Sequence, residues 1–168
     1  MFKVNIMSGE KRRTELGAFI EFLKHRCGFT FNKDDFDHRI MLQKYVFIAK
    51  FLGWNHRYSY NIYLRGPYSP NLADDYYSLS DPTPFENYND YLKDMDLDEF
   101  KNVINEKDIP WLEIGTTILS LYDRYCEVYS GNDLENYLLE KTVDIKSSYE
   151  NAFIEGVLED LKRYSLIN

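Results

Sequence analysis

Apolar residues recur at helical spacing along most of this chain and at strand spacing in a single segment. Only residues 57–66, RYSYNIYLRG, alternate between two sets of side chains, and this alternation predicts a strand. The pattern predicts a mainly α fold with a small β element, a compact helical domain that is winged-helix-like. The helices are predicted over about 10–26, 35–52, from Ser69-Pro70 onward, 96–105, Pro110 to Tyr129, 133–141 and 145–165.

Turn and capping residues predict where these elements begin and end. Gly66-Pro67 should end the strand, because proline cannot donate a hydrogen bond to a neighbouring strand. Ser69 is a favourable N-cap and Pro70 a favourable first helical residue. The remaining expectations are a cap at Asn32 or Asp34, a loop over 80–96, and a helix stop at Ser130-Gly131.

The bulk composition predicts one folded domain that spans residues 1–168. The chain has 168 residues, of which 44% are hydrophobic and 29% charged, as in ordinary globular proteins. No apolar run approaches the roughly 20 residues that a membrane-spanning helix needs, so no membrane partner is expected. The N-terminal residues lack the pattern of a signal peptide, which predicts a cytoplasmic location with reduced thiols at Cys27 and Cys126.

Charge is distributed unevenly along the chain. Residues 1–66 contain 12 Lys or Arg and 6 Asp or Glu, whereas residues 67–168 contain 8 and 22. The two parts can simply attract each other, or the basic part can meet an acidic partner. Both interpretations stay open from the sequence.

No catalytic or cofactor motif stands out in the sequence. Phosphate-binding glycine loops and clustered zinc ligands are absent from the sequence. Adjacent acids such as Asp34/Asp35, Asp74/Asp75 and Glu159/Asp160 are more typical of solvated surfaces than of metal sites. We therefore predict no catalytic residue, no metal and no cofactor.

The candidate site lies around the stretch YLRGPYSP at residues 63–70. Strand alternation places Arg57, Asn61, Tyr63 and Arg65 on one face, and the turn does not require an arginine at 65 or a tyrosine at 68. Tyrosine and arginine are common at binding hot spots. We predict that these residues and Tyr68 bind an acidic macromolecule; the alternative pairs Arg65 internally with an acid such as Asp74 or Asp75.

A second polar surface is predicted on the helix over 35–52. Arg39, Gln43 and Lys50 project to the same side of this helix and form a polar, basic stripe. The stripe is either a solvated face or an extension of the candidate site.

Two segments carry a family resemblance. The sequences LQKYVFIAKFLGW and YSYNIYLRGPYSPNLADDYYSL resemble the YwgA-like family, which is similar to the SocA-like, or Panacea, antitoxin domain. The matching positions are Leu42, Gln43, Lys44, Tyr60, Tyr63, Gly66, Pro67, Tyr68, Ser69 and Leu72. The Gly-Pro-Tyr-Ser turn departs from the Gly-Pro-Val that is more usual in the antitoxin branch.

The resemblance implies a non-enzymatic interaction module, antitoxin-like or adaptor-like. Its partner would be a protein, such as a toxin or a target delivered to a protease. It also adds Lys44 to the candidate binding residues, although Gln43 and Lys44 can instead hydrogen-bond the strand while Tyr68 packs under the turn. The alternative function is a DNA-binding regulator, for which the acidic pI of about 4.9 is unfavourable.

Overall fold

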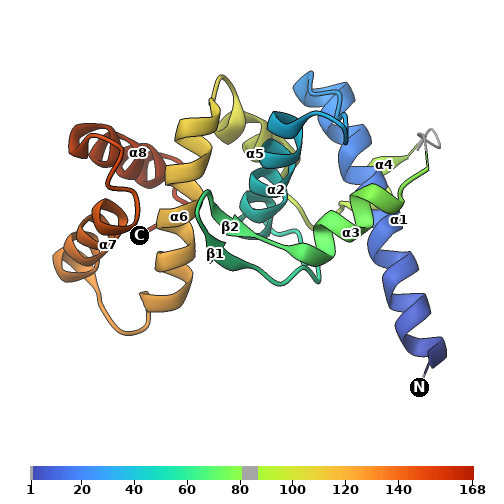
Figure 1. Ribbon diagram of the computed structural model, residues 1–168, viewed down its shortest axis with the longest axis horizontal. Coiled ribbons are helices and arrows are strands. Elements are labelled where there is room, and N and C mark those ends of the chain that lie inside the picture. Colours follow the sequence, from blue (N-terminus) through green and yellow to red (C-terminus); the bar gives the residue numbers. More distant parts are fainter. Residues whose placement is uncertain (1, 81–86) are drawn as a thin grey trace. The chain divides into compact units, whose positions relative to one another are not determined.

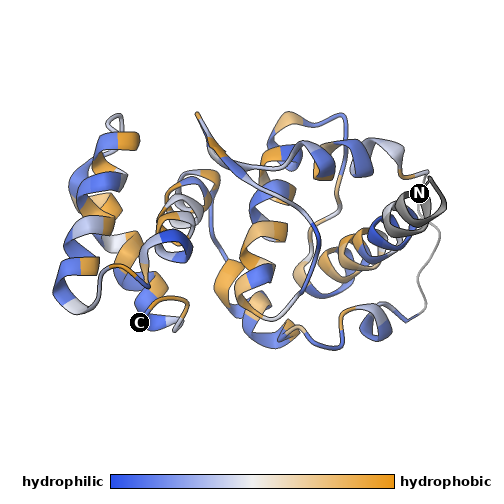
Figure 2. Ribbon diagram, turned by 90° about the horizontal axis from the view of Figure 1, so that it is seen from below, coloured by the Kyte–Doolittle hydropathy of each residue, from blue (hydrophilic) through white to orange (hydrophobic). Residues whose placement is uncertain are grey.

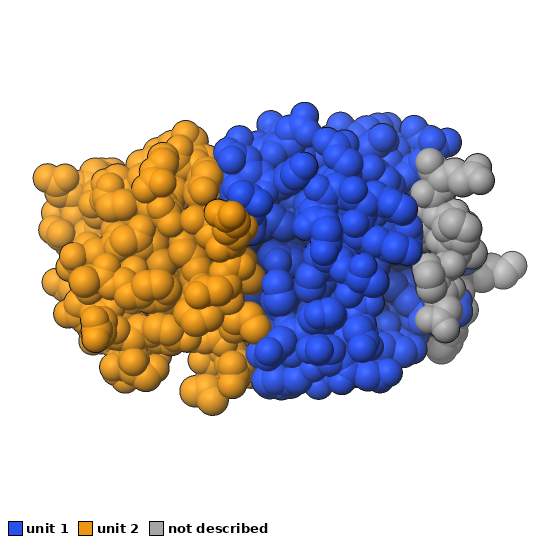
Figure 3. Space-filling view, turned by 90° about the horizontal axis from the view of Figure 1, so that it is seen from above, with its two compact units in different colours: residues 1–60, 69–105 blue, residues 61–68, 106–168 orange. Residues whose placement is uncertain are grey.

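A computed structural model confirms the mainly α prediction, with 66% of the chain helical and one small antiparallel sheet (Figure 1). It describes residues 2–80 and 87–168, with side chains from Gly9 onward. The chain divides into two compact units, and each is described by itself (Figure 3). Unit 1 comprises residues 1–60 and 69–105, and unit 2 comprises residues 61–68 and 106–168. The winged-helix-like arrangement and the single domain over 1–168 stay predictions.

The described part of unit 1 contains five helices around an aromatic core. The ring of Phe19, in the first helix, lies 4.7 Å from the ring of Trp54 and 5.4 Å from that of Phe100. Most of these helices bury an apolar side, and Figure 2 shows hydrophobic and hydrophilic residues alternating along the ribbons. The helices are α1 (Phe2–Cys27), α2 (Phe36–Phe51), α3 (Pro70–Ser78), α4 (Tyr88–Tyr91) and α5 (Leu97–Ile104).

Most boundaries in unit 1 follow the predictions, with three corrections. Helix α1 begins at Phe2, upstream of the predicted start at 10, and ends before Gly28, whose φ of 69° suits glycine. The cap of α2 is Asp35, not Asn32 or Asp34, because its carboxylate accepts the amide of His38. The short α4 lies within the predicted loop over 80–96, of which 81–86 fall outside the described residues.

Unit 2 packs three helices and a hairpin. The elements are β1 (Asn61–Tyr63), β2 (Gly66–Tyr68), α6 (Ile109–Tyr125), α7 (Gly131–Ile145) and α8 (Asn151–Arg163). Helix α6 is central, since it packs against β2, α7 and α8. Its apolar face is buried, as its spacing predicts, and it begins at an Asp108 cap.

Three predicted boundaries in unit 2 are wrong. Helix α6 stops at Tyr125, short of Tyr129. Ser130 and Gly131 do not close α6; they open α7, which then extends past the predicted 141 to Ile145. Helix α8 begins at Asn151, later than the predicted 145. A Ser-Gly pair between two helices can end the first or begin the second, and the sequence alone does not show which.

The predicted strand is a hairpin in the structure. Gly66-Pro67 does not end the β element but opens its second strand, and Ile62 pairs with Pro67 in antiparallel register. Side chains still alternate between exposed and covered from Arg57 to Tyr63, so the period-two pattern was correct even where no ladder forms. None of the helices in the described residues is both long and apolar enough to cross a membrane.

Candidate functional site

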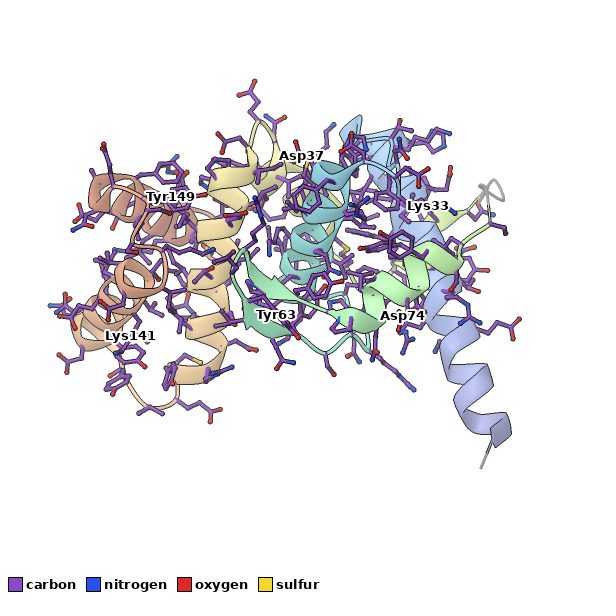
Figure 4. All side chains as sticks on the ribbon, in the orientation of Figure 1. Lys33, Asp37, Tyr63, Asp74, Lys141 and Tyr149 are labelled. Atoms are coloured by element: carbon purple, nitrogen blue, oxygen red, sulfur yellow. The ribbon has the colours of Figure 1, made fainter. Side chains whose placement is uncertain are left out.

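The tip of the β1–β2 hairpin is the most exposed apolar point among the described residues of unit 2. Leu64 at the tip is 92% exposed, and its neighbour Tyr63, labelled in Figure 4, is 51% exposed. Gly66, two residues after Leu64, has a φ of 87°, which an L side chain rarely adopts. The chain can therefore reverse sharply here and leave residues 63–65 projecting.

A buried carboxylate stands behind this tip. Nη1 of Arg65 lies 3.2 Å from Oε1 of Glu113 on α6. The Glu113 side chain is only 6% exposed, whereas that of Arg65 is 53% exposed. Burying a carboxylate is costly unless charged or hydrogen-bonding groups surround it, so this ion pair anchors the hairpin to α6.

Lys146 fixes the backbone of the tip directly. Its Nζ donates to the carbonyl oxygen of Leu64 at 2.9 Å and lies 3.8 Å from Oε2 of Glu113. Burial lowers the pKa of Lys146, and the adjacent Glu113 acts in the opposite direction. The hydroxyl of Tyr149 donates to the same carboxylate at 3.1 Å. We call Glu113, Lys146, Tyr149 and Arg65 the anchor cluster.

Four predicted binding residues lie in unit 2, on the hairpin. Asn61, Tyr63 and Arg65 are exposed, as the strand pattern predicts. Tyr68 is half-buried, and its ring packs at 5.5 Å against that of Tyr63. Tyr68 therefore supports Tyr63 from the opposite strand.

The other four predicted residues lie in unit 1, and two of them are buried. Gln43 and Lys44 are each 2% exposed, so they belong to the core of this unit and not to an exposed stripe. Arg39 is half-buried and donates to the carbonyl of Lys33. Arg57 is exposed. A partner reaching unit 1 would therefore meet Arg39 and Arg57 but not the other two.

Gln43 has a structural role at the start of α3. Its amide accepts the N–H of Ser69 and donates to the carbonyl of Ser69, both at 2.9 Å. The side chain thus mimics a strand backbone and satisfies a buried residue that caps α3. The alternative prediction for Gln43 was a structural hydrogen bond to the strand. Gln43 does have a structural hydrogen-bonding role, but its partner is Ser69, the residue after β2.

Arg65 does pair internally with an acid, as the alternative interpretation expects, but that acid is Glu113 and not Asp75. Asp75 is buried, and it is bound by Nε of Arg12 at 2.6 Å and by the hydroxyl of Tyr58 at 2.8 Å. Arg12 also donates a second bond from Nη2, so the contact is bidentate. Arg65 pairs with Glu113 instead.

Sequence reasoning missed Glu113, Lys146 and Tyr149. Glu113 lies in the otherwise apolar stretch WLEIG, and an acid surrounded by core positions is the signal that the sequence offers. Lys146 and Tyr149 gave no such signal, because they follow α7 in a turn that the sequence pattern assigned to a helix.

Acidic, histidine and cysteine side chains are spread over the described residues. Within residues 9–80 and 87–168, no group of three or more His, Cys, Asp or Glu is placed to hold a metal ion. Cys27 and Cys126 are free thiols. Burial raises the pKa of Cys27 to about 11, which disfavours the reactive thiolate.

No family model, curated protein or solved structure matches this chain. The resemblance to the YwgA-like and Panacea families therefore stays a prediction from the two sequence segments.

Proposed function

We propose that this chain is a non-enzymatic protein-interaction module that binds an acidic protein through the tip of its β1–β2 hairpin. The observation that supports the proposal is the contrast at residue 64. The Leu64 side chain is 92% exposed, while its own carbonyl is held by the buried ammonium of Lys146. An exposed apolar side chain on a fixed backbone is suited to binding a partner.

Rigidity at the tip lowers the entropic cost of binding. A loop that must be ordered on association loses part of its contact energy to that ordering. Here Arg65 and Lys146 hold the turn before any partner arrives, since both reach the Glu113 carboxylate. The tip is therefore preorganised.

The residue types at the tip also favour recognition. Tyrosine and arginine provide large contact area together with hydrogen-bond donors, and they dominate measured hot spots. Tyr63 and Arg65 flank Leu64, so an apolar anchor lies between two such residues. The 51% exposure of Tyr63 leaves much of its ring available.

Local charge indicates the sign of the partner. Residues 38–73 contain five Lys or Arg and no Asp or Glu, although the chain as a whole has a net charge of −8. Within unit 2, the tip and its anchor cluster carry two cations, Arg65 and Lys146, against the one carboxylate of Glu113, so an acidic surface of a partner would be attracted to the tip. If the family resemblance holds, that partner is a toxin or a target delivered to a protease.

DNA binding is the second candidate, and it uses the same basic segment. Phosphate contacts would require several exposed cations, but Lys44 is buried and Arg65 is paired with Glu113. We therefore favour protein binding over DNA binding as the function. A duplex that binds with a steep loss of affinity as salt rises would reverse this order.

Site-specific photocrosslinking in cells of the source organism tests the proposal. A photoreactive phenylalanine analogue replaces Leu64 in one variant and Val128, which is 67% exposed in the same unit, in the control. We expect a protein adduct from position 64 that is absent from position 128 and lost when Arg65→Glu is added. No adduct at 64, or equal adducts at both positions, would overturn the proposal.

A further inference from the structure

The hairpin has an outer edge that the proposed function does not yet use. Strand β2 packs against α6, and β1 pairs with β2 in a two-stranded sheet, so among the described strands none covers the other edge of β1. Asn61 and Tyr63 of β1 are exposed, whereas Gly66 and Pro67 of β2 are buried. A strand with one paired side has backbone groups on the other side that can bind a further strand.

Pro67 determines which backbone groups face that edge. Residues opposite each other in an antiparallel pair alternate between those that exchange two hydrogen bonds and those that exchange none. Ile62 lies opposite Pro67, which has no N–H, so this pair is of the second kind. The N–H and C=O of Ile62 therefore point away from β2, toward the outer edge of β1.

We infer that the outer edge of β1 binds an extended, acidic peptide segment of the protein partner as a third strand. The main chain of the segment exchanges two hydrogen bonds with Ile62, and its side chains contact Tyr63 and Leu64 at the tip. The inference rests on the proposed function and specifies how the partner binds there.

Charge argues that the segment is acidic. Residues 61–68 contain Arg65 and no acidic residue, and with the anchor cluster the hairpin has two cations, Arg65 and Lys146, against the one carboxylate of Glu113, so a further carboxylate beside the strand meets a net positive charge. A basic segment would gain nothing here, and two basic edges would repel each other, which disfavours pairing between two copies of this hairpin.

A displayed library of random dodecapeptides, selected against the intact protein, provides the probe. We expect enriched peptides with alternating β-branched and acidic residues. The decisive variant is Ile62→Pro, which removes the outward N–H but no bond to β2, and proline is tolerated at such edge positions. The control is Ile62→Ala, which shortens the side chain and keeps the N–H.

The expected result is that Ile62→Pro weakens binding of an enriched peptide by about tenfold or more, as for the loss of a backbone hydrogen bond with its partner unsatisfied. Ile62→Ala should weaken it less. If Ile62→Pro fails to fold by circular dichroism, peptides that are N-methylated at alternate residues replace it, and one of the two methylation registers should abolish binding.

Other outcomes separate this inference from the proposed function. Peptides that bind equally to wild type and Ile62→Pro but lose affinity for Leu64→Asp would overturn strand addition and leave the tip as the binding site. Failure to enrich any peptide would also overturn strand addition, while the crosslink at position 64 tests the proposed function independently.

Discussion

The guanidinium of Arg65 lies 3.2 Å from the carboxylate of Glu113, and one member of this pair is exposed while the other is buried. Arg65 is therefore neither a purely exposed binding residue nor a purely buried structural one. Arg65 can contribute to stability through its contact with Glu113 and still present part of its side chain to a partner. The variants below separate these two contributions.

Removal of Glu113 should destabilise the protein more than removal of Arg65. Glu113→Ala leaves Lys146 buried without its neutralising carboxylate, so we expect a loss of about 3–5 kcal/mol. Arg65→Ala leaves Glu113 with Lys146 and Tyr149, so about 1–2 kcal/mol is expected. Urea unfolding of both variants measures the difference, and equal losses would show that Arg65 is the main support of the carboxylate.

Gln43→Met should cost about 2–4 kcal/mol in the free energy of unfolding. The methionine fills a similar volume but leaves the N–H of Ser69 buried without its partner, while the C=O of Ser69 keeps only the amide of Ala73. The control is Lys50→Met, on the exposed part of the same helix, with an expected change within about 0.5 kcal/mol. Similar values for both variants in thermal or urea unfolding would contradict a structural role for Gln43.

Trp111→Ala should destabilise the protein by about 3–5 kcal/mol, because Trp111 is 5% exposed at the start of α6. Its Nε1 also donates to Asp160 at 2.9 Å. Trp111→Phe keeps most of the ring and loses that hydrogen bond, so a smaller loss of about 1–2 kcal/mol is expected. An alanine variant that loses less than about 1 kcal/mol in urea unfolding would show that the side chain is not part of the core.

Stability should fall as pH drops below about 6.5 because of His56. Its Nδ1 accepts the amide of Tyr58 and its Nε2 lies 3.0 Å from the carbonyl of Val46, an arrangement that suits the neutral ring. Burial lowers the pKa of His56 from 6.5 to about 4. Between these values the unfolded chain binds more protons, so the contribution of about 3 kcal/mol is complete above 6.5 and lost toward 4.

The measurement is the urea midpoint at several pH values between 4 and 7, for wild type and for His56→Gln. The glutamine variant should be less stable at pH 7 and should show a flatter dependence on pH. An unchanged pH dependence in the variant would assign the acid sensitivity to other groups.

The sequence predicted the helices well because their apolar stripes directly report which side is buried. It predicted the alternating exposure of Arg57 to Tyr63 for the same reason. It did not predict the hairpin, because Gly66-Pro67 is compatible both with the end of a strand and with a turn followed by a new strand.

The candidate site was predicted only in part. Exposed residues such as Tyr63 and Arg65 were recognised from alternation, but their support was not, because Glu113 and Lys146 come from segments 48 and 82 positions away in the chain from the residues they bind. Gln43 was assigned to a surface because a polar residue on a helix is usually exposed. Its burial depends on a backbone partner that no local pattern reveals.

Gln43 also contacts both ends of the hairpin segment. Its backbone carbonyl accepts the hydroxyl of Tyr60 at 3.3 Å, and its side chain binds Ser69. Tyr60 and Ser69, the two residues that flank the hairpin, are thus both bound to Gln43 of α2, and these contacts use no side chain of the eight residues between them. The hairpin could therefore be exchanged for a loop of another length while this junction is kept, in the way that antibodies vary their loops on a constant framework.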